Sequence, residues 1–202
     1  MTAEDMATFE RCIAVGGVAL FPADTVYGLA TEPDSREGVE RLYRIKRRRP
    51  DRPAAVMFFD LELALAALPE LGERTRAALE RLLPGPVTAV LPNPAHRYPL
   101  ACGPVPDRIG LRVPALDGPL EPLRAVRWPV LQSSANPTGE ADARRLEDVD
   151  ASIRAEVDLA LDGGELPGTP STVVDLSSYE FGGGFTVLRP GAVPRDELEA
   201  IL

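Results

Sequence analysis

Apolar residues recur along this chain at two spacings, and together they predict helices that alternate with short buried strands. Met6, Phe9 and Ile13 are three or four residues apart, which is typical of one helix face, and Gly16-Gly17 would end that helix. The apolar run of residues 18–22 predicts a buried strand. Further helices are expected over residues 35–45, 61–83 with a break near Pro69 and Gly72, 120–126, 146–156 and 195–202. Further strands are expected over residues 54–59, 87–91, 109–113, 159–161, 172–176 and 185–188, and residues 130–136 run from a strand into a loop.

The order of these elements predicts an α/β fold with a mixed sheet. Strands alternate with helices in the first part of the chain, whereas the last two strands follow one another across Gly182-Gly183-Gly184 and are expected to form a hairpin. We interpret residues 23–29 as a loop of unusual composition, because polar and apolar groups interleave there around a glycine. A chain of 202 residues is long enough for one sizeable core, so one domain is expected.

Composition and charge exclude several classes of protein. The net charge of −9 argues against a general nucleic-acid binder, which needs a broad basic face. Cys12, Cys102 and the single histidine, His96, have no spacing typical of a metal site, and we expect two free thiols. The longest apolar run is shorter than the ~18–20 residues that span a bilayer, and no basic segment typical of a signal peptide begins the chain. We therefore expect a cytoplasmic protein without membrane contact.

One stretch reverses the sign of the charge. Between Arg36 and Arg52 only three acids oppose eight basic residues, which gives this window +5 in an acidic chain. Lys46, the only lysine among 22 basic residues, lies within it. Such a cluster either attracts an anionic ligand or is a solvated helix end, and charge alone does not decide between these interpretations. The basic residues are Arg36, Arg41, Arg44, Lys46, Arg47, Arg48, Arg49 and Arg52.

Small polar clusters occur where predicted strands end, as they often do around ligand crevices of open α/β sheets. They comprise residues 22–28, 133–136, 170–172 and 189–191, together with Arg112 inside an apolar strand. The hydroxyl groups could instead cap turns. A buried Arg112 needs an anionic partner, which is either a structural Asp or Glu or the carboxylate of a substrate.

Taken together, these motifs resemble those of the YrdC-domain family, the threonylcarbamoyl-AMP synthases. The resemblance covers about residues 10–195, with seven motifs in the family's order. It implies an open twisted sheet of mixed parallel and antiparallel strands, flanking helices and a central basic cavity, with residues 1–202 forming a single YrdC-like domain. The matching segments are Pro22-Ala23-Asp24-Thr25-Val26-Tyr27-Gly28-Leu29, Lys46-Arg47-Arg48, Pro84-Gly85-Pro86-Val87-Thr88, the Arg112 strand, Ser134-Ala135-Asn136, Ser171-Thr172-Val173-Val174-Asp175 and Arg189-Pro190-Gly191.

The resemblance also implies a nucleotidyltransferase reaction. Threonine and bicarbonate would give N-carboxythreonine, whose carboxylate attacks the α-phosphate of ATP and releases pyrophosphate. Partner proteins would transfer the threonylcarbamoyl group to tRNA next to the anticodon, with at most a weak tRNA contact by this chain. Mg²⁺ would bridge phosphate oxygens, although no carboxylate cage for a metal is evident. By motif position Thr25, Arg112 and Ser171 would bind threonine, and Lys46, Arg48, Arg52, Ser134, Asn136 and Arg189 would bind ATP.

Three departures from the family pattern leave alternatives open. Ala23 replaces a usual threonine, and Gln132 stands where a small residue is common. Arg49 replaces the usual proline, so Arg47, Arg48 and Arg49 all remain candidates for the phosphate contact. The chain also resembles the form of the family without an extra C-terminal domain. Two other functions remain open, namely a non-catalytic RNA-binding module and a paralogue that has lost the synthase reaction.

Overall fold

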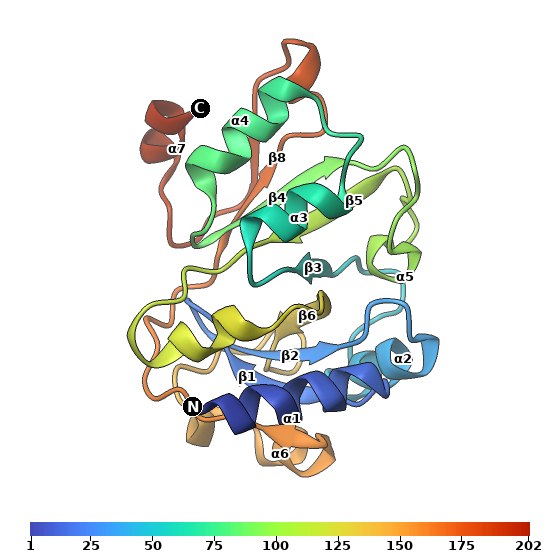
Figure 1. The fold of residues 1–202 in the computed structure, drawn as a ribbon, viewed down its shortest axis with the longest axis vertical. Helices are drawn as coiled ribbons and strands as arrows, with labels where there is room; N and C mark the ends of the chain where they lie inside the picture. Colours follow the sequence, from blue (N-terminus) through green and yellow to red (C-terminus); the bar gives the residue numbers. More distant parts are fainter.

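Nine strands form one sheet in the order β7-β1-β2-β6-β3-β5-β4-β8-β9, in a computed structural model that describes residues 1–202 (Figure 1). The sheet takes strands from the whole chain, so segments far apart in sequence meet along it. The strands are β1 (Ala19–Pro22), β2 (Tyr27–Thr31), β3 (Ala55–Met57), β4 (Val87–Pro92), β5 (Arg108–Arg112), β6 (Val130–Ser134), β7 (Leu159–Ala160), β8 (Thr172–Asp175) and β9 (Thr186–Arg189).

Parallel and antiparallel pairs both occur, which confirms the mixed sheet. β1 with β7, β3 with β5 and β4 with β8 run parallel, whereas the other neighbours run antiparallel. The final pair, β8 and β9, is antiparallel and confirms the predicted hairpin. At the centre, β6 and β5 flank β3, so residues 55, 110 and 132 lie side by side.

Helices flank the sheet and carry the ends of the chain. In Figure 1, α1, α3 and α4 lie in front of the strands, whereas α6 lies at one end of the molecule and α7 near the other. None of the helices is long and apolar enough to cross a bilayer. The α-helices are α1 (Ala3–Ala14), α2 (Arg36–Ile45), α3 (Leu61–Ala67), α4 (Glu73–Leu82), α5 (Pro99–Cys102), α6 (Ala151–Glu156) and α7 (Arg195–Ile201), and the 3₁₀ helices are η1 (Gly118–Ala125), η2 (Leu146–Asp148) and η3 (Tyr179–Phe181).

Polar side chains fix where the helices near the site begin. The Ser35 hydroxyl accepts a hydrogen bond from Gly38 N at 3.1 Å, which caps the first turn of α2. Gly38 also lets α2 approach β2 closely, because a Cβ there would overlap the Thr31 hydroxyl. The start of α2 is therefore fixed against the sheet, and its C-terminal end projects toward the end of β6.

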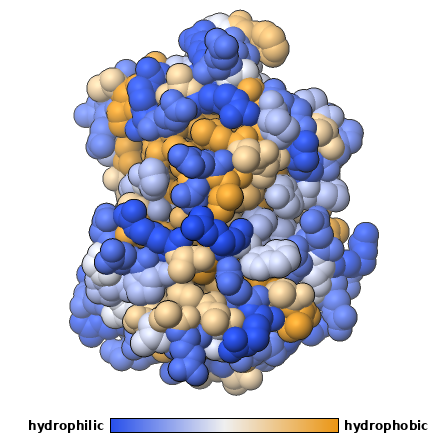
Figure 2. Space-filling model, viewed as in Figure 1, coloured by the Kyte–Doolittle hydropathy of each residue, from blue (hydrophilic) through white to orange (hydrophobic).

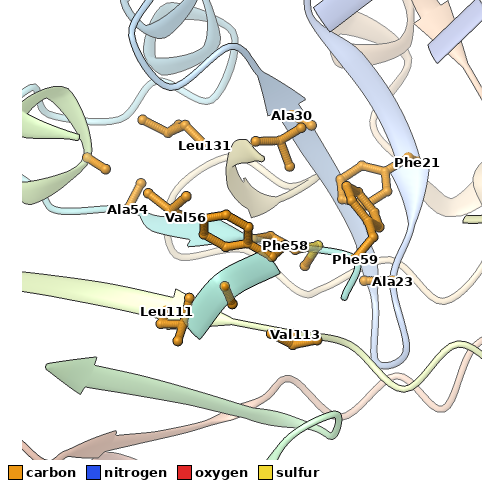
Figure 3. Packing of buried hydrophobic residues seen from close by; sticks show 14 of the residues in the cluster. Phe21, Ala23, Ala30, Ala54, Val56, Phe58, Phe59, Leu111, Val113 and Leu131 are labelled. Atoms are coloured by element: carbon orange, nitrogen blue, oxygen red, sulfur yellow. The ribbon is translucent and has the colours of Figure 1, made fainter. Parts of the chain in front are cut away.

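The core combines residues of the sheet with the apolar faces of the helices. Three aromatic rings from separate elements meet, with centroid distances of 5.5 Å between Phe9 and Phe21 and 5.9 Å between Phe9 and Phe59. Figure 3 shows Phe21 and Phe59 side by side, with Val56 of β3 near Leu111 and Leu131 of the adjacent strands. Polar side chains near the strand ends are thus held by a tightly packed scaffold.

Three predictions of local structure were wrong, and one short helix was missed. Residues 27–29, expected within the loop 23–29, belong to β2, whose five residues are all buried. The segment around residue 120 is a 3₁₀ helix, because Pro119 and Pro122 remove backbone donors that an α-helix needs. The expected helix over 146–156 is divided into η2 and α6, and the short helix α5 was missed.

The face viewed in Figure 2 is mostly hydrophilic, with hydrophobic residues gathered at about the level of α3 and α4.

Both thiols, Cys12 and Cys102, are free, as the sequence predicts. His96 lies on the surface, where its Nε2 is 2.7 Å from Asp107 Oδ1. Neither the thiols nor the imidazole belongs to a group of three or more potential metal ligands.

Candidate functional site

A cavity of about 390 Å³ lies over the central strands. Its 21 lining residues come mainly from β3, β4, β5, β6, β8 and β9 and the segments beside them. Five of the predicted site residues line it, namely Arg48, Arg112, Ser134, Ser171 and Arg189. These five residues bring three guanidinium groups and two hydroxyl groups to one space, although their positions span more than 140 residues of sequence. The lining also includes Arg108, which was not among the predicted site residues and pairs with Asp175 at 3.0 Å.

The other four predicted residues lie outside this lining. Thr25 is buried behind Arg112, and its hydroxyl accepts a hydrogen bond from Arg112 Nη2 at 2.7 Å. Asn136 is buried beside Ser134, whose hydroxyl donates to Asn136 Oδ1 at 2.6 Å. Lys46 is buried below the same loop, whereas the Arg52 side chain is exposed to solvent. Thr25, Asn136 and Lys46 are thus connected to the cavity through residues that line it.

Arg112 is held by a carboxylate that was not among the predicted site residues. Arg112 is 4% exposed, and its Nη2 forms an ion pair with Oδ1 of Asp24, whose side chain is 6% exposed. The second Asp24 oxygen accepts a hydrogen bond from Ala115 N at 3.0 Å, so both oxygens are used. Of the two partners that the sequence allowed for Arg112, the structure contains the structural aspartate. The sequence contained an indication of this partner, because Asp24 stands beside Thr25 in the first polar cluster.

Arg112 nevertheless keeps donor capacity for a ligand. Its Nε is buried and has no hydrogen-bond partner within the protein. A buried donor without a partner is unfavourable by about 1–3 kcal/mol, so an acceptor supplied by a ligand would relieve this penalty. Because Arg112 lines the cavity, its guanidinium lies beside the space that a carboxylate ligand could occupy.

Arg48 resembles Arg112 in having some donors bound by the protein and its Nε without a partner. The half-buried Arg48 donates through Nη2 to Pro53 O and through Nη1 to Ser133 Oγ at 3.4 Å, and its Nε is buried without a partner. Of the three arginines considered for the phosphate contact, Arg48 alone lines the cavity, because Arg47 is exposed and Arg49 forms an ion pair with Asp51 at 2.6 Å.

Ser171 and Arg189 are brought together by the last hairpin. Arg189 Nη2 donates to Ser171 O at 2.8 Å and lies 3.3 Å from its hydroxyl oxygen. The Ser171 hydroxyl is also 2.8 Å from the hydroxyl of Thr88 on β4. Gly191 permits this approach, because a Cβ at that position would overlap Pro170 O. The glycine of the Arg-Pro-Gly motif is therefore required by the close packing of the backbone against Pro170.

Lys46 differs from the arginines in having no unused donor. Its ammonium donates to Ser134 O, to Asn136 O at 2.8 Å and to Asn136 Oδ1 at 3.2 Å. Burial, with the nearby charge of Arg48, lowers the pKa of Lys46 to about 7, although Asp142 acts in the opposite direction. The only lysine of the basic stretch is therefore part of the protein interior.

The rest of the basic stretch lies on the surface. Arg36, Arg44, Arg47 and Arg52 are exposed. Arg41 forms an ion pair with Asp158 at 2.5 Å and does not line the cavity. Most of the local positive charge is thus solvated, and the contribution of this stretch to the cavity lining is limited to Arg48.

Comparison with known proteins assigns these features to one family. Residues 11–191 match the family model Sua5_yciO_yrdC, described as telomere recombination. The chain is 29% identical over 191 residues to the threonylcarbamoyl-AMP synthase of Pyrococcus abyssi (strain GE5 / Orsay), with 94% of this chain and 55% of that protein aligned. It is 33% identical over 183 residues to the threonylcarbamoyl-AMP synthase of Chromohalobacter salexigens, with 89% and 96% aligned.

Solved structures give the same result for the fold. The crystal structure of P. abyssi Sua5 complexed with L-threonine superposes with a TM-score of 0.85 and 27% sequence identity, covering 100% of this chain and 58% of that one. The chain thus spans between half and two thirds of the P. abyssi protein, and nearly the whole length of the C. salexigens relative.

Proposed function

The chain belongs to the Sua5/YciO/YrdC family, and we propose from this that it acts as an L-threonylcarbamoyladenylate synthase. The proposed reaction joins ATP, L-threonine and bicarbonate to give threonylcarbamoyl-AMP and pyrophosphate, which makes the chain a nucleotidyltransferase. Two relatives that bear this enzyme name align with about nine tenths of the chain.

The convergence of three guanidinium groups on one cavity carries the proposal. Arg48, Arg112 and Arg189 lie around the same space of about 390 Å³, and the fourth arginine of its lining, Arg108, already pairs with Asp175. Guanidinium groups bind carboxylates and phosphates through paired hydrogen bonds, and they remain charged at all physiological pH values. A substrate set with one carboxylate and one polyphosphate matches this arrangement.

We assign the threonine end to Thr25, Arg112 and Ser171. The unpartnered Arg112 Nε would receive the threonine carboxylate, while Asp24 and Thr25 both accept from Nη2. The solved complex of the P. abyssi relative with L-threonine supports binding of this amino acid by the family. Ser171 lies close enough to Arg189 to place the two ends of the site in contact.

We assign the nucleotide end to Arg48, Arg52, Ser134, Asn136 and Arg189. Arg48 offers a buried Nε without a partner, and Arg189 lines the same cavity. Arg52 is exposed at the end of the basic stretch and would reach the outer phosphates. Lys46 was also assigned to the triphosphate by its motif, and its contacts are considered in the next subsection.

The residues of the cavity would act by positioning and by charge stabilisation. Threonine and bicarbonate would first combine with loss of water to give N-carboxythreonine. Its carboxylate oxygen would attack the α-phosphorus, and the bond to the bridging oxygen of pyrophosphate would break. The guanidinium groups would stabilise the negative charge on the phosphoryl oxygens and on the leaving group. No nucleophilic side chain is needed, since the attacking atom belongs to the substrate.

Mg²⁺ is included in the proposal only as an ion bound by the nucleotide phosphates. The chain has no group of three or more His, Cys, Asp or Glu side chains that could hold a metal ion. Mg²⁺ usually keeps several waters and binds through substrate phosphates, so it needs few protein ligands. No step of the proposed reaction depends on a protein-bound metal.

The wider setting is also proposed. Residues 1–202 would act as one unit, because one sheet and one core cluster include residues from both ends of the chain. The threonylcarbamoyl group would pass to tRNA next to the anticodon through separate transfer proteins, in the cytoplasm.

Pyrophosphate release tests the proposal. We expect release only when ATP, L-threonine and bicarbonate are all present, and a product whose mass equals that of threonylcarbamoyl-AMP. ATP turnover that ignores threonine would contradict the proposal. Tight tRNA binding with a steep salt dependence and no pyrophosphate release would favour an RNA-binding module instead.

A further inference from the structure

We propose that Lys46 is a positioning residue that holds loop 134–140 in its shape, and that it is not a phosphate ligand. This inference deepens the proposed function, and its consequence for ATP binding rests on that function. The geometry of the loop itself does not depend on it.

The turn that follows α2 directs Lys46 inward. Lys46 caps the helix, and Arg47 adopts a left-handed backbone conformation with φ of 50°. Arg48 N then donates to Tyr43 O at 2.8 Å, and Arg47 N donates to Arg44 O at 3.0 Å. Glycine usually occupies such a position, since a non-glycine residue there is strained by ~1–3 kcal/mol. The surrounding contacts must compensate for this strain.

The Lys46 ammonium is saturated by the loop. Lysine has three donor hydrogens, and here three oxygens accept from Nζ: Ser134 O, Asn136 O at 2.8 Å and Asn136 Oδ1 at 3.2 Å. With 1% of its surface exposed, Lys46 does not line the cavity. A phosphate contact would require these hydrogen bonds to break and would leave buried carbonyl oxygens without donors.

The main chain of Lys46 holds the far side of the same loop. Lys46 O accepts hydrogen bonds from Thr138 N at 3.1 Å and from the Thr138 hydroxyl at 3.3 Å. The loop is closed further by Asn136 Nδ2, which donates to Glu140 O at 2.5 Å. One residue therefore fixes both limbs of the loop that presents Ser134 and Asn136 to the nucleotide end of the site.

Charge distribution agrees with this division of roles. Arg48 is the cation that comes from the same turn and lines the cavity, with its Nε unpartnered. A guanidinium stays charged, whereas the burial of Lys46 favours loss of its proton. Phosphate charge is thus better matched by Arg48 than by Lys46.

The test is backbone hydrogen exchange of the full chain without ATP or threonine. Lys46→Met keeps a chain of similar length but removes every donor, and we expect amides of residues 134–140 to exchange at least ~10-fold faster than in the wild type, as loss of buried hydrogen bonds implies. Arg44→Met is the matched control, because Arg44 is exposed on α2, and it should leave exchange in the loop unchanged.

Lys46→Arg separates the two roles. A phosphate ligand would be partly replaced by arginine, and the KM for ATP would recover. A positioning residue would not, because the larger planar guanidinium does not fit three oxygens arranged around an ammonium in a buried site. We expect Lys46→Arg to leave loop exchange fast and the KM for ATP raised more than that for threonine.

Unchanged loop exchange in Lys46→Met, together with a raised KM for ATP, would overturn the inference. If Lys46→Met does not fold, Lys46→Gln decides, because its shorter side chain keeps a polar end but cannot supply three donors where the ammonium lies, and it leaves every Asn136 contact to Ser134 and Glu140 in place. Faster exchange confined to residues 134–140 in Lys46→Gln supports the inference, and unchanged exchange there overturns it. Since these measurements use no substrate, their outcome is separate from that of the pyrophosphate assay.

Discussion

Two buried cations lie beside the same cavity, and their surroundings differ. Arg112 forms an ion pair with a buried carboxylate, Asp24, and keeps its Nε unpartnered. Lys46 contacts no carboxylate, and neutral oxygens of one loop accept from its ammonium. Arg112 lines the cavity and keeps one donor without a protein partner, so it can serve a ligand, whereas the saturated Lys46 holds protein structure.

The largest expected effect on stability comes from removing the carboxylate of Asp24. In Asp24→Ala, Arg112 becomes a buried cation without a counter-ion, and breaking a buried pair in this way destabilises proteins by about 3–5 kcal/mol. We expect a loss of that size in the free energy of unfolding, measured by urea denaturation. Asp117→Ala is the matched control, because Asp117 pairs with Arg124 on the surface and exposed pairs contribute about 0–1 kcal/mol. Equal losses in the two variants would contradict the role given to Asp24.

The pH dependence of stability distinguishes the two cations, because of the two only Lys46 can lose its proton near neutral pH. Its pKa is lowered from 10.5 to about 7, so between these pH values the folded protein holds fewer protons than the unfolded chain. The free energy of unfolding should then rise with pH by up to ~1.4 kcal/mol per unit, relative to Lys46→Met. Arg48 and Asp142 are the charged groups that act on Lys46, and both are kept in the variant. Parallel pH profiles for the two proteins would contradict this prediction.

The smallest expected effect on stability comes from Thr88, an uncharged residue that pairs with Arg112 in the sheet. Thr88→Val removes the hydroxyl that lies 2.8 Å from the Ser171 hydroxyl, while it keeps the shape of the side chain. We expect a loss of about 1 kcal/mol in the free energy of unfolding, which is typical of one hydrogen bond between neutral groups. A loss above that of Asp24→Ala would reverse the order proposed here.

Local patterns were enough to predict most of the sheet and its class. They failed at β2, because all five of its residues are buried and no alternation of polar and apolar positions marks it as a strand. They also failed at residues 118–125, where the two prolines favour a 3₁₀ helix. Both errors arise where tertiary burial or missing donors outweigh the spacing of apolar residues.

The site was predictable as a set of residues but not as a set of contacts. Motif positions identified Arg48, Arg112, Ser134, Ser171 and Arg189, which line one cavity. The partners of Lys46 are 88 and 90 residues away in sequence, and no local pattern indicates them. Asp24 could be read as a candidate partner of Arg112, but only the fold selects it from the many carboxylates of an acidic chain.

Calorimetric titration of L-threonine into the Arg112→Met and Lys46→Met variants tests the contrast between the two cations most directly. We expect Arg112→Met to weaken threonine binding by more than ~30-fold, equivalent to about 2 kcal/mol, because a charge-assisted hydrogen bond to the carboxylate is lost. Lys46→Met should change the threonine affinity by less than ~3-fold, since Lys46 lies outside the cavity lining. Equal weakening in both variants, or weakening in Lys46→Met alone, would contradict the account.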